Sequence, residues 1–371
     1  MNIRLMKLFD AVVGRIAIPA IPVPLRSKAS SPITSLLIIR PGGIGDAVLL
    51  APVIRSLKKY YPAVHITVLA EQRNAGVFGL ICGVDKLLCY DRPSELLHAL
   101  QHRYYAVIDS EQWHRMSAVV ARFTSAAVKI GFDTNERRRM FTHLIPYSHD
   151  DYEADSFAHL LEPLEIKTND AEMDAPFLLV PDAASRKAAS LLAALNGQPF
   201  VTIFPGASIP ERQWGVDRFH CVAEVLSAFG VRVVVVGGRA DFRQGEMIAT
   251  GDVGLNLANS TSLAETAAVI QKSSLLLSGD SGVLHIAVGL GVPTVSLFGP
   301  GRAKKWAPQD GERHVVIDKR LLCSPCTTFG TTPPCPIAAQ CMRDITVDEV
   351  VAAVTVLLTG GNSQKKTSGA Y

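Results

Sequence analysis

Residues 36–50 read LLIIRPGGIGDAVLL, and this stretch decides the fold class. LLII is a continuous apolar run, as expected of a strand buried inside a parallel sheet. PGGIGD supplies a glycine-rich turn, and Leu50, Val53, Ile54 and Leu57 then recur at helical spacing. A buried strand that leads at once through a turn into a helix indicates the α/β class.

The alternation of strands and helices continues through both halves of the chain. It predicts two doubly wound, Rossmann-like domains that face each other across a cleft. We expect an N-terminal amphipathic segment and linker in residues 1–32, a first domain in 33–185, a second domain in 186–358 and a polar tail in 359–371. Further strand candidates are residues 65–70, 86–90, 105–109, 127–132, 200–208, 231–238, 255–259, 274–282 and 294–300.

Composition bounds the class of protein. The chain has 371 residues, of which 48% are hydrophobic and 19% charged, so each of two domains can bury a core. Lys and Arg number 37 against 34 Asp and Glu, and this net charge of +3 lacks the strongly basic character that nucleic-acid backbones select. No uncharged apolar run reaches the roughly 18 residues that span a bilayer. We therefore expect neither a nucleic-acid partner nor a polytopic membrane protein.

The N-terminal segment allows two interpretations. As a helix it gathers apolar residues on one face, which the cations largely avoid. Such a helix lies in the surface of an anionic membrane or packs on the first domain. Asp10 and Arg15 interrupt the apolar core that a signal peptide would need, so we expect a reducing, cytoplasmic location. The apolar face comprises Leu5, Leu8, Phe9, Val12, Val13 and Ile16.

The turn PGGIGD carries the first candidate for chemistry. Gly43 and Gly45 permit close approach of a ligand, and the helix that follows offers N–H groups to an anion. Asp46 enters this helix at the carboxyl end of a strand, where open α/β sheets bind ligands. A carboxylate there is well placed to be a general base. A tight structural turn accounts for the glycines equally well.

SGDSGVLHIAVGLGVPTVSLFG, residues 278–299, carries the second candidate. Asp280, Ser281 and Gly282 fall between a buried strand and a helix. Ser281 can cap that helix, whose first N–H groups can hold a diphosphate, and His285 lies on its first turn.

FPGASIPERQW, residues 204–214, places Ser208 and Arg212 after another strand. Arg212 can pair with a phosphate or a carboxylate, although an exposed loop arginine is commonly just solvated. The sequence contains no D-x-D pair at a strand end, so we expect a leaving group to be stabilised by helix dipoles and Arg212 rather than by a catalytic metal.

Four of the seven cysteines fall within nineteen residues, spaced C-x2-C-x8-C-x5-C. This spacing suits tetrahedral zinc or iron in a structural role, because a four-cysteine shell leaves no open position for catalysis. Reduced thiols and a disulfide are the alternatives. The four are Cys323, Cys326, Cys335 and Cys341.

Together these motifs resemble the ADP-heptose–lipopolysaccharide heptosyltransferase family, glycosyltransferase family 9. LLIIRPGGIGDAVLLAPVIRSL, IDSEQ, FPGAS with RQW, VVGG, SGDSGVLHIAVGLGVPTVSLFG and CMRDIT follow the family's order from about residue 35 to 358. The resemblance implies a GT-B fold and inverting transfer of a heptose from ADP-heptose to a lipid-linked core saccharide in envelope synthesis. It makes the first domain the acceptor side and the second the nucleotide-sugar side, at the inner face of the bacterial inner membrane.

The resemblance also implies roles for individual residues. Asp46 would deprotonate the acceptor hydroxyl, and Arg212 stands where the family often has Lys, facing the donor phosphates. Asp241 is the nearest candidate for a nucleoside contact. Arg137, Arg138 and Arg139 are either contacts for an anionic acceptor or a solvated face. The candidates for nucleotide-sugar binding are Gly43, Gly45, Ser208, Arg212, Asp241, Asp280, Ser281, Gly282 and His285.

Other functions stay open at this point. A related transferase would use another nucleotide sugar or a protein acceptor, and a non-catalytic protein would only bind the sugar nucleotide. Two Rossmann-like halves also suit a nucleotide-dependent oxidoreductase, but the sequence lacks the G-x-G-x-x-G fingerprint with its downstream acid.

Overall fold

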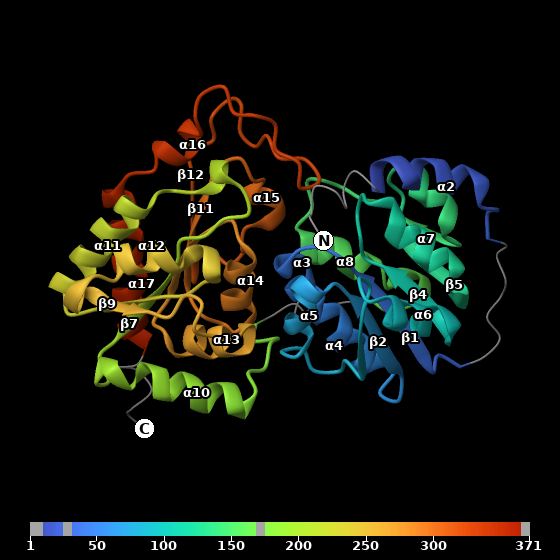
Figure 1. Ribbon diagram of the computed structural model, residues 1–371, viewed down its shortest axis with the longest axis horizontal. Helices are drawn as coiled ribbons and strands as arrows, with labels where there is room; N and C mark the ends of the chain where they lie inside the picture. The colour runs from blue at the N-terminus through green and yellow to red at the C-terminus, as the bar shows by residue number, and fades with distance from the viewer. Residues whose placement is uncertain (1–9, 25–31, 168–174, 365–371) are drawn as a thin grey trace. The chain divides into compact units, whose positions relative to one another are not determined.

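The computed structural model describes residues 10–24, 32–167 and 175–364 (Figure 1). The chain forms two compact units, Met1–Phe177 and Leu178–Tyr371. Each unit contains one parallel sheet of six strands with helices packed on it. The expected α/β, doubly wound class is therefore confirmed.

The division between the units falls earlier than the sequence placed it. It lies between Phe177 and Leu178, whereas we expected residue 185 to end the first domain. The cause is helix α10 (Asp182–Leu192), which packs along α13 (Leu263–Lys272) and so belongs wholly to the second unit.

The first sheet has the strand order β3-β2-β1-β4-β5-β6. Its centre is β1, whose residues Leu36, Leu37, Ile38 and Ile39 are fully buried, as the apolar run LLII predicts. The strands are β1 (Ser35–Arg40), β2 (His65–Ala70), β3 (Lys86–Cys89), β4 (Arg103–Asp109), β5 (Ser125–Phe132) and β6 (His143–Ile145). The helices that follow these strands are α3 (Ile44–Leu49), α4 (Ala51–Tyr60), α5 (Gln72–Phe78), α6 (Pro93–Gln101), α7 (Arg115–Phe123), η2 (Glu136–Met140) and α8 (Glu153–His159).

The second sheet repeats this pattern with the order β12-β11-β10-β7-β8-β9. Its strands are β7 (Phe200–Phe204), β8 (Arg232–Val235), β9 (Gly254–Asn256), β10 (Leu276–Gly279), β11 (Thr294–Phe298) and β12 (His314–Asp318). The helices are α10, η4 (Ala193–Leu195), η5 (Pro210–Arg212), α11 (Val216–Ala228), η6 (Arg239–Asp241), α12 (Phe242–Ile248), η7 (Gly251–Val253), α13, α14 (Gly282–Gly289), α15 (Ala303–Trp306), α16 (Gln340–Arg343) and α17 (Val347–Gln364).

The last helix begins where the sequence predicts a capping box and ends later than expected. The Glu349 carboxylate accepts from the Thr346 N–H at 2.8 Å, and the Thr346 hydroxyl accepts from the Glu349 N–H at 3.2 Å. α17 continues to Gln364, so the segment that we predicted as a polar tail from residue 359 begins inside the helix.

The N-terminal segment packs on the first unit over its described residues. The π-helical turn η1 (Asp10–Gly14) and α2 (Arg15–Ala20) lie against α7 and η2, with Ile18 fully buried. The Asp10 carboxylate accepts from the first two N–H groups of α7, at 2.8 and 2.7 Å. The expected apolar face is not the buried one, because Ile18 is inside and Ile16 is outside. Leu5, Leu8 and Phe9 lie outside the described residues. Over the part of the chain that the structure covers, no helix has the length and apolar character to cross a membrane.

Candidate functional site

Polar side chains gather where the strand order of each sheet reverses. In the first sheet this point lies between β1 and β4, and in the second it lies between β7 and β10. Chains that leave neighbouring strands at such a point turn to opposite faces of the sheet, which leaves a crevice at the carboxyl ends. Asp46 follows β1, and Asp280 follows β10.

Asp46 occupies the first turn of α3, and the glycines before it make room for its carboxylate. A Cβ at Gly43 would lie 2.8 Å from Asp46 Oδ2, so any side chain there would displace the carboxylate from its present position. Gly42 adopts a φ of 102°, which also favours glycine. Gly45 lies in the same helical turn as Asp46. The Asp46 side chain is 21% exposed, so one edge of the carboxylate can reach a substrate.

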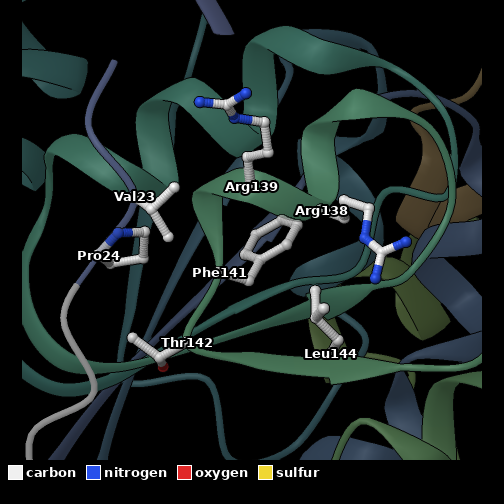
Figure 2. Close-up of a pocket in the computed structure, with 7 residues that line it drawn as sticks. All are labelled: Val23, Pro24, Arg138, Arg139, Phe141, Thr142 and Leu144. Carbon is white, nitrogen blue, oxygen red and sulfur yellow. The ribbon is translucent and has the colours of Figure 1, made fainter. Parts of the chain in front are cut away.

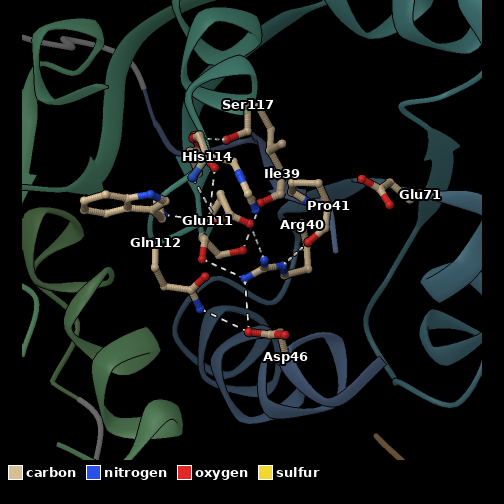
Figure 3. A network of polar contacts seen from close by, with 12 residues as sticks. Ile39, Arg40, Pro41, Asp46, Glu71, Glu111, Gln112, His114 and Ser117 are labelled. Carbon is tan, nitrogen blue, oxygen red and sulfur yellow. Dashed lines mark hydrogen bonds and ion pairs between the residues drawn. The ribbon is translucent and has the colours of Figure 1, made fainter. Parts of the chain in front are cut away.

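Arg40 holds the carboxylates of this site in place (Figure 3). Its buried guanidinium lies 2.7 Å from Glu111 Oε2 and 3.7 Å from Asp46 Oδ1. Burial alone would raise the pKa of Glu111, but Arg40, together with His114, lowers it to about 2. The pair therefore stays charged and leaves Arg40 fixed beside Asp46.

Gln112 connects Asp46 to a second acidic residue. Its Nε2 donates to Asp46 Oδ1 at 3.1 Å and also to Glu153 Oε1. Glu153 is fully buried and accepts from the Tyr147 hydroxyl at 2.9 Å. Burial and the neighbouring Glu153 raise the pKa of Tyr147, so the phenol keeps its proton and remains a donor. These bonds fix the Gln112 amide and, through it, the orientation of Asp46.

Sequence reasoning missed these partners. Glu111 and Gln112 stand in the IDSEQ stretch directly after β4. The sequence signal that could have indicated them is their position, since they are polar residues that follow a buried strand beside the point of reversal. Tyr147 and Glu153 follow β6, and nothing in their sequence surroundings distinguishes them.

The arginine run after β5 divides into one buried and two exposed side chains. Arg137 is fully buried, and its Nη2 lies 2.6 Å from Asp109 Oδ2 at the end of β4. Arg138 pairs with Asp133 at 3.0 Å, and Arg139 is exposed. Arg137 is therefore neither an acceptor contact nor part of a solvated face, and the two interpretations remain predictions for the exposed Arg138 and Arg139.

The second site brings together Arg212, Asp280 and His285. Arg212 Nη1 lies 3.0 Å from Asp280 Oδ2, but the geometry between them makes no hydrogen bond. Arg212 Nε, Asp280 Oδ2 and His285 Nδ1 are all buried without a hydrogen-bond partner. Buried polar atoms without a hydrogen-bond partner are uncommon in folded proteins, so these three can accept or donate further hydrogen bonds to a polar ligand.

His285 is neutral in this setting. Burial lowers its pKa to about 4 against the opposing effect of Asp280. The ring packs edge-on against Trp306, with the centroids 6.4 Å apart. One ring nitrogen of neutral imidazole carries a proton, so His285 can donate one hydrogen bond and accept one.

α14 presents its N-terminus at the same place. The Ser281 hydroxyl caps the helix by accepting from the Leu284 N–H at 3.3 Å, as the sequence predicts. Ser278 supports it through a 2.8 Å hydroxyl contact. Gly282 is the first residue of α14, and the positive end of the helix favours an anion there.

Asp241 and Ser208 lie at the same edge of the sheet but outside this cluster. Asp241 Oδ2 accepts from the Gly238 N–H at 2.8 Å, and burial raises the pKa of the carboxyl. A Cβ at Gly206 would come within 2.3 Å of Asp241 Oδ1, so the carboxylate lies over the end of β7. Ser208 is exposed on the loop before η5. The structure does not bring either residue into contact with Arg212.

The four clustered cysteines do not form the metal site that their spacing predicts. Within residues 10–24, 32–167 and 175–364, no three His, Cys, Asp or Glu side chains converge as metal ligands. Cys341 is buried in the second core, whereas Cys323 is exposed. Cys335 Sγ accepts from the Ala339 N–H at 3.2 Å, and burial raises the pKa of the Cys326 and Cys341 thiols. The four thiols therefore differ in exposure, and neighbouring thiols add to the raised pKa of Cys326 and Cys341.

Comparisons with known proteins identify the family and the fold. The family model described as glycosyltransferase family 9 (heptosyltransferase) matches residues 94–334. Lipopolysaccharide heptosyltransferase 3 of Escherichia coli is 29% identical over 288 residues, which cover 71% of this chain and 83% of that protein. Lipooligosaccharide heptosyltransferase 2 of Haemophilus ducreyi is 25% identical over 351 residues, covering 87% and 99%. The solved structure of E. coli ADP-heptose lps heptosyltransferase II has the same fold, with a TM-score of 0.71 at 21% identity and coverage of 89% and 100%.

Proposed function

Because the chain belongs to glycosyltransferase family 9, we propose that it transfers a heptose from ADP-heptose to a lipid-linked core saccharide, with inversion at the anomeric carbon. The relatives named for lipopolysaccharide and lipooligosaccharide heptosyl transfer support this substrate class. Membership of the family decides against the oxidoreductase alternative.

The observation that carries the proposal is the partly exposed carboxylate of Asp46. It lies at a sheet's reversal point and is oriented by Gln112 at 3.1 Å. An acceptor hydroxyl must lose its proton as it attacks the anomeric carbon, and a carboxylate held in this way can take that proton. Arg40 Nη1 lies 3.7 Å from the same carboxylate and forms an ion pair with it.

The second site supplies stabilisation for the leaving group. As the glycosidic bond to the diphosphate breaks, negative charge grows on the phosphate oxygens. The Arg212 guanidinium and the N–H groups at the start of α14 can take up that charge, with Ser281 holding the helix end in place. His285 and Asp280 flank the position, and Asp241 and Ser208 are the candidates for contacts with the rest of the donor. We assign this stabilisation to these protein groups, without a catalytic metal or cofactor.

We place the reaction at the cytoplasmic face of the bacterial inner membrane, because a lipid-linked acceptor is held there by its lipid. The test is incubation of the purified chain with ADP-heptose and a core saccharide acceptor. Mass spectrometry is expected to show one added heptose, and NMR an anomeric configuration opposite to that of the donor. Transfer from another nucleotide sugar alone, or to protein alone, would contradict the proposed donor or acceptor.

A further inference from the structure

We propose that the first unit binds an anionic lipid bilayer through one surface, which we call the N-terminal patch. The proposal rests on the proposed function in one respect, since a lipid-linked acceptor brings the enzyme to a membrane. The surface itself is argued from the structure. Its apolar members are Val12, Ile16, Val23 and Phe123, and its cations are Arg15, Arg138 and Arg139.

The apolar side chains of the patch are large and lie mostly exposed. Val12 and Ile16 are 51% and 71% exposed and lie four residues apart, on the side of the segment away from buried Ile18. Val23 and Phe123 are 56% and 60% exposed. Single exposed apolar residues are ordinary, so their grouping is what matters.

A hydrogen bond joins two parts of the patch. Arg122 Nε donates to the Pro22 carbonyl at 3.0 Å, which holds the end of α7 against the chain that leaves α2. Phe123 and Val23 are the next residues on either side of this bond. α2 also packs on η2, the element that carries Arg138 and Arg139.

A small hollow lies within the patch (Figure 2). It has a volume of about 260 Å³, and Phe141 lies in its middle between Val23 and Pro24 on one side and Leu144 on the other. The guanidinium groups of two arginines extend around it. An apolar floor with guanidinium groups at its edge suits a phosphate headgroup whose glycerol and acyl chain lie over apolar side chains. The lining residues are Val23, Pro24, Arg138, Arg139, Phe141, Thr142 and Leu144.

The charge around the patch is positive. The acids of this region, Asp133 and Glu136, are paired with Arg138 and Arg115, at 3.0 and 2.6 Å. Arg15 and Arg139 add further exposed positive charge. Basic residues beside exposed apolar ones are the combination that anionic membrane surfaces bind, because charge attracts the protein and apolar side chains insert. We therefore assign the patch to an anionic bilayer rather than to a second copy of the chain.

The experiment is co-sedimentation of the full-length chain with vesicles of phosphatidylglycerol and phosphatidylethanolamine, and with vesicles of phosphatidylcholine. We expect binding to the anionic vesicles that weakens as salt rises from 0.05 to 0.5 M, with little binding to phosphatidylcholine, because screening shortens the reach of the arginine charges. Equal binding to both kinds of vesicle, or none to either, would overturn the proposal.

The variant Ile16→Glu with Val23→Glu tests the surface itself. We expect its partition onto anionic vesicles to fall about tenfold or more, because each substitution places a charge where an apolar side chain would insert. The matched control is Leu97→Glu on α6, which is 54% exposed on the same unit and should bind as the wild type does. All three substituted side chains are exposed, so the double variant and the control should keep the wild-type melting temperature. A double variant that binds like the control would overturn the proposal.

Two further measurements separate this proposal from its rivals. Transfer of heptose to a deacylated, water-soluble acceptor should be the same in the double variant and the wild type, whereas transfer to acceptor held in vesicles should fall in the variant. If the wild type transfers heptose to neither acceptor, the proposed function fails, and the vesicle experiment still decides the patch. Light scattering should show the same mass for the wild type and the double variant. If the wild type is a dimer and the double variant is a monomer, the patch binds a second copy of the chain instead.

Discussion

The Asp46 site and the Asp280 site both lie beside the point where the strand order reverses, yet their polar atoms are paired very differently. Around Asp46, a buried arginine and a glutamine amide connect three carboxylates through hydrogen bonds and ion pairs. Around Asp280, three buried polar atoms have no hydrogen-bond partner. The first arrangement holds a base in one orientation, and the second presents groups that a ligand can satisfy. Substitutions at the Asp46 site should therefore impair the chemical step, and substitutions at the Asp280 site should impair donor binding.

The largest expected effect comes from Asp46→Asn. The amide cannot accept the acceptor's proton, so we expect kcat to fall about 10³-fold, within the range for removal of a general base. Donor affinity, measured by calorimetry, should change less than about threefold, because the donor groups lie in the other unit. Unchanged transfer would remove Asp46 from the mechanism.

Arg212→Ala should weaken use of the donor, which Asp46→Asn should leave nearly unchanged. Loss of the guanidinium weakens both diphosphate binding and stabilisation of the leaving group, so we expect kcat/KM for the donor to fall about 10²-fold. Arg212→Lys should recover part of the loss, because it restores the charge without the planar fork. Kinetics at varied donor concentration measure this. A variant whose donor KM and kcat both match the wild type would contradict the assignment.

Gln112→Ala tests whether orientation of the base matters. The substitution removes the amide between Asp46 and Glu153, so we expect kcat to fall about tenfold with the donor KM unchanged. The second measurement is the pH profile of kcat. A loss confined to thermal stability, with kcat and its pH profile intact, would make Gln112 purely structural.

The second unit should be the more acid-sensitive one. His285 has a pKa of about 4 in the folded chain against about 6.5 when unfolded, so below pH 6.5 the unfolded state binds the proton first and stability falls with pH. Between pH 7 and pH 5 this costs about 2 kcal/mol. Denaturant unfolding at the two pH values checks it, with His285→Gln as the comparison. A variant as pH-sensitive as the wild type would show that other groups control the loss.

Chelation should have the smallest effect. Since the cysteines do not converge as ligands, treatment with a strong chelator is expected to leave the melting temperature unchanged within about 1 °C. Elemental analysis of the purified chain provides the control. Stoichiometric zinc or iron together with a large fall in melting temperature would restore the predicted metal site.

The sequence predicted features that depend on neighbouring residues and missed those that depend on distant ones. The LLII strand, the capping box of α17 and the serine cap of α14 follow from residues within a few positions of each other. Gln112 and Glu153 are far apart in sequence and meet only because β4 and α8 fold together. Arg137 in the run RRR gave no sign that it would be buried, because its partner, Asp109, lies on another strand.

The structure does not support the metal alternative for the cysteines, and the reason is related. Spacing describes how ligands can be arranged along a loop, but it does not show that Cys341 is buried in the second core while Cys323 is exposed. The N-terminal segment shows the same limit, since helical periodicity predicted one apolar face and packing on α7 and η2 selected another.

The most direct test of the central claim is calorimetric titration of the purified chain with ADP-heptose, UDP-glucose, dTDP-rhamnose and NAD. We predict that ADP-heptose binds selectively, that Asp46→Asn retains this binding, and that Arg212→Ala loses most of it. Binding of NAD alone, or equal binding of all four compounds, would contradict the account.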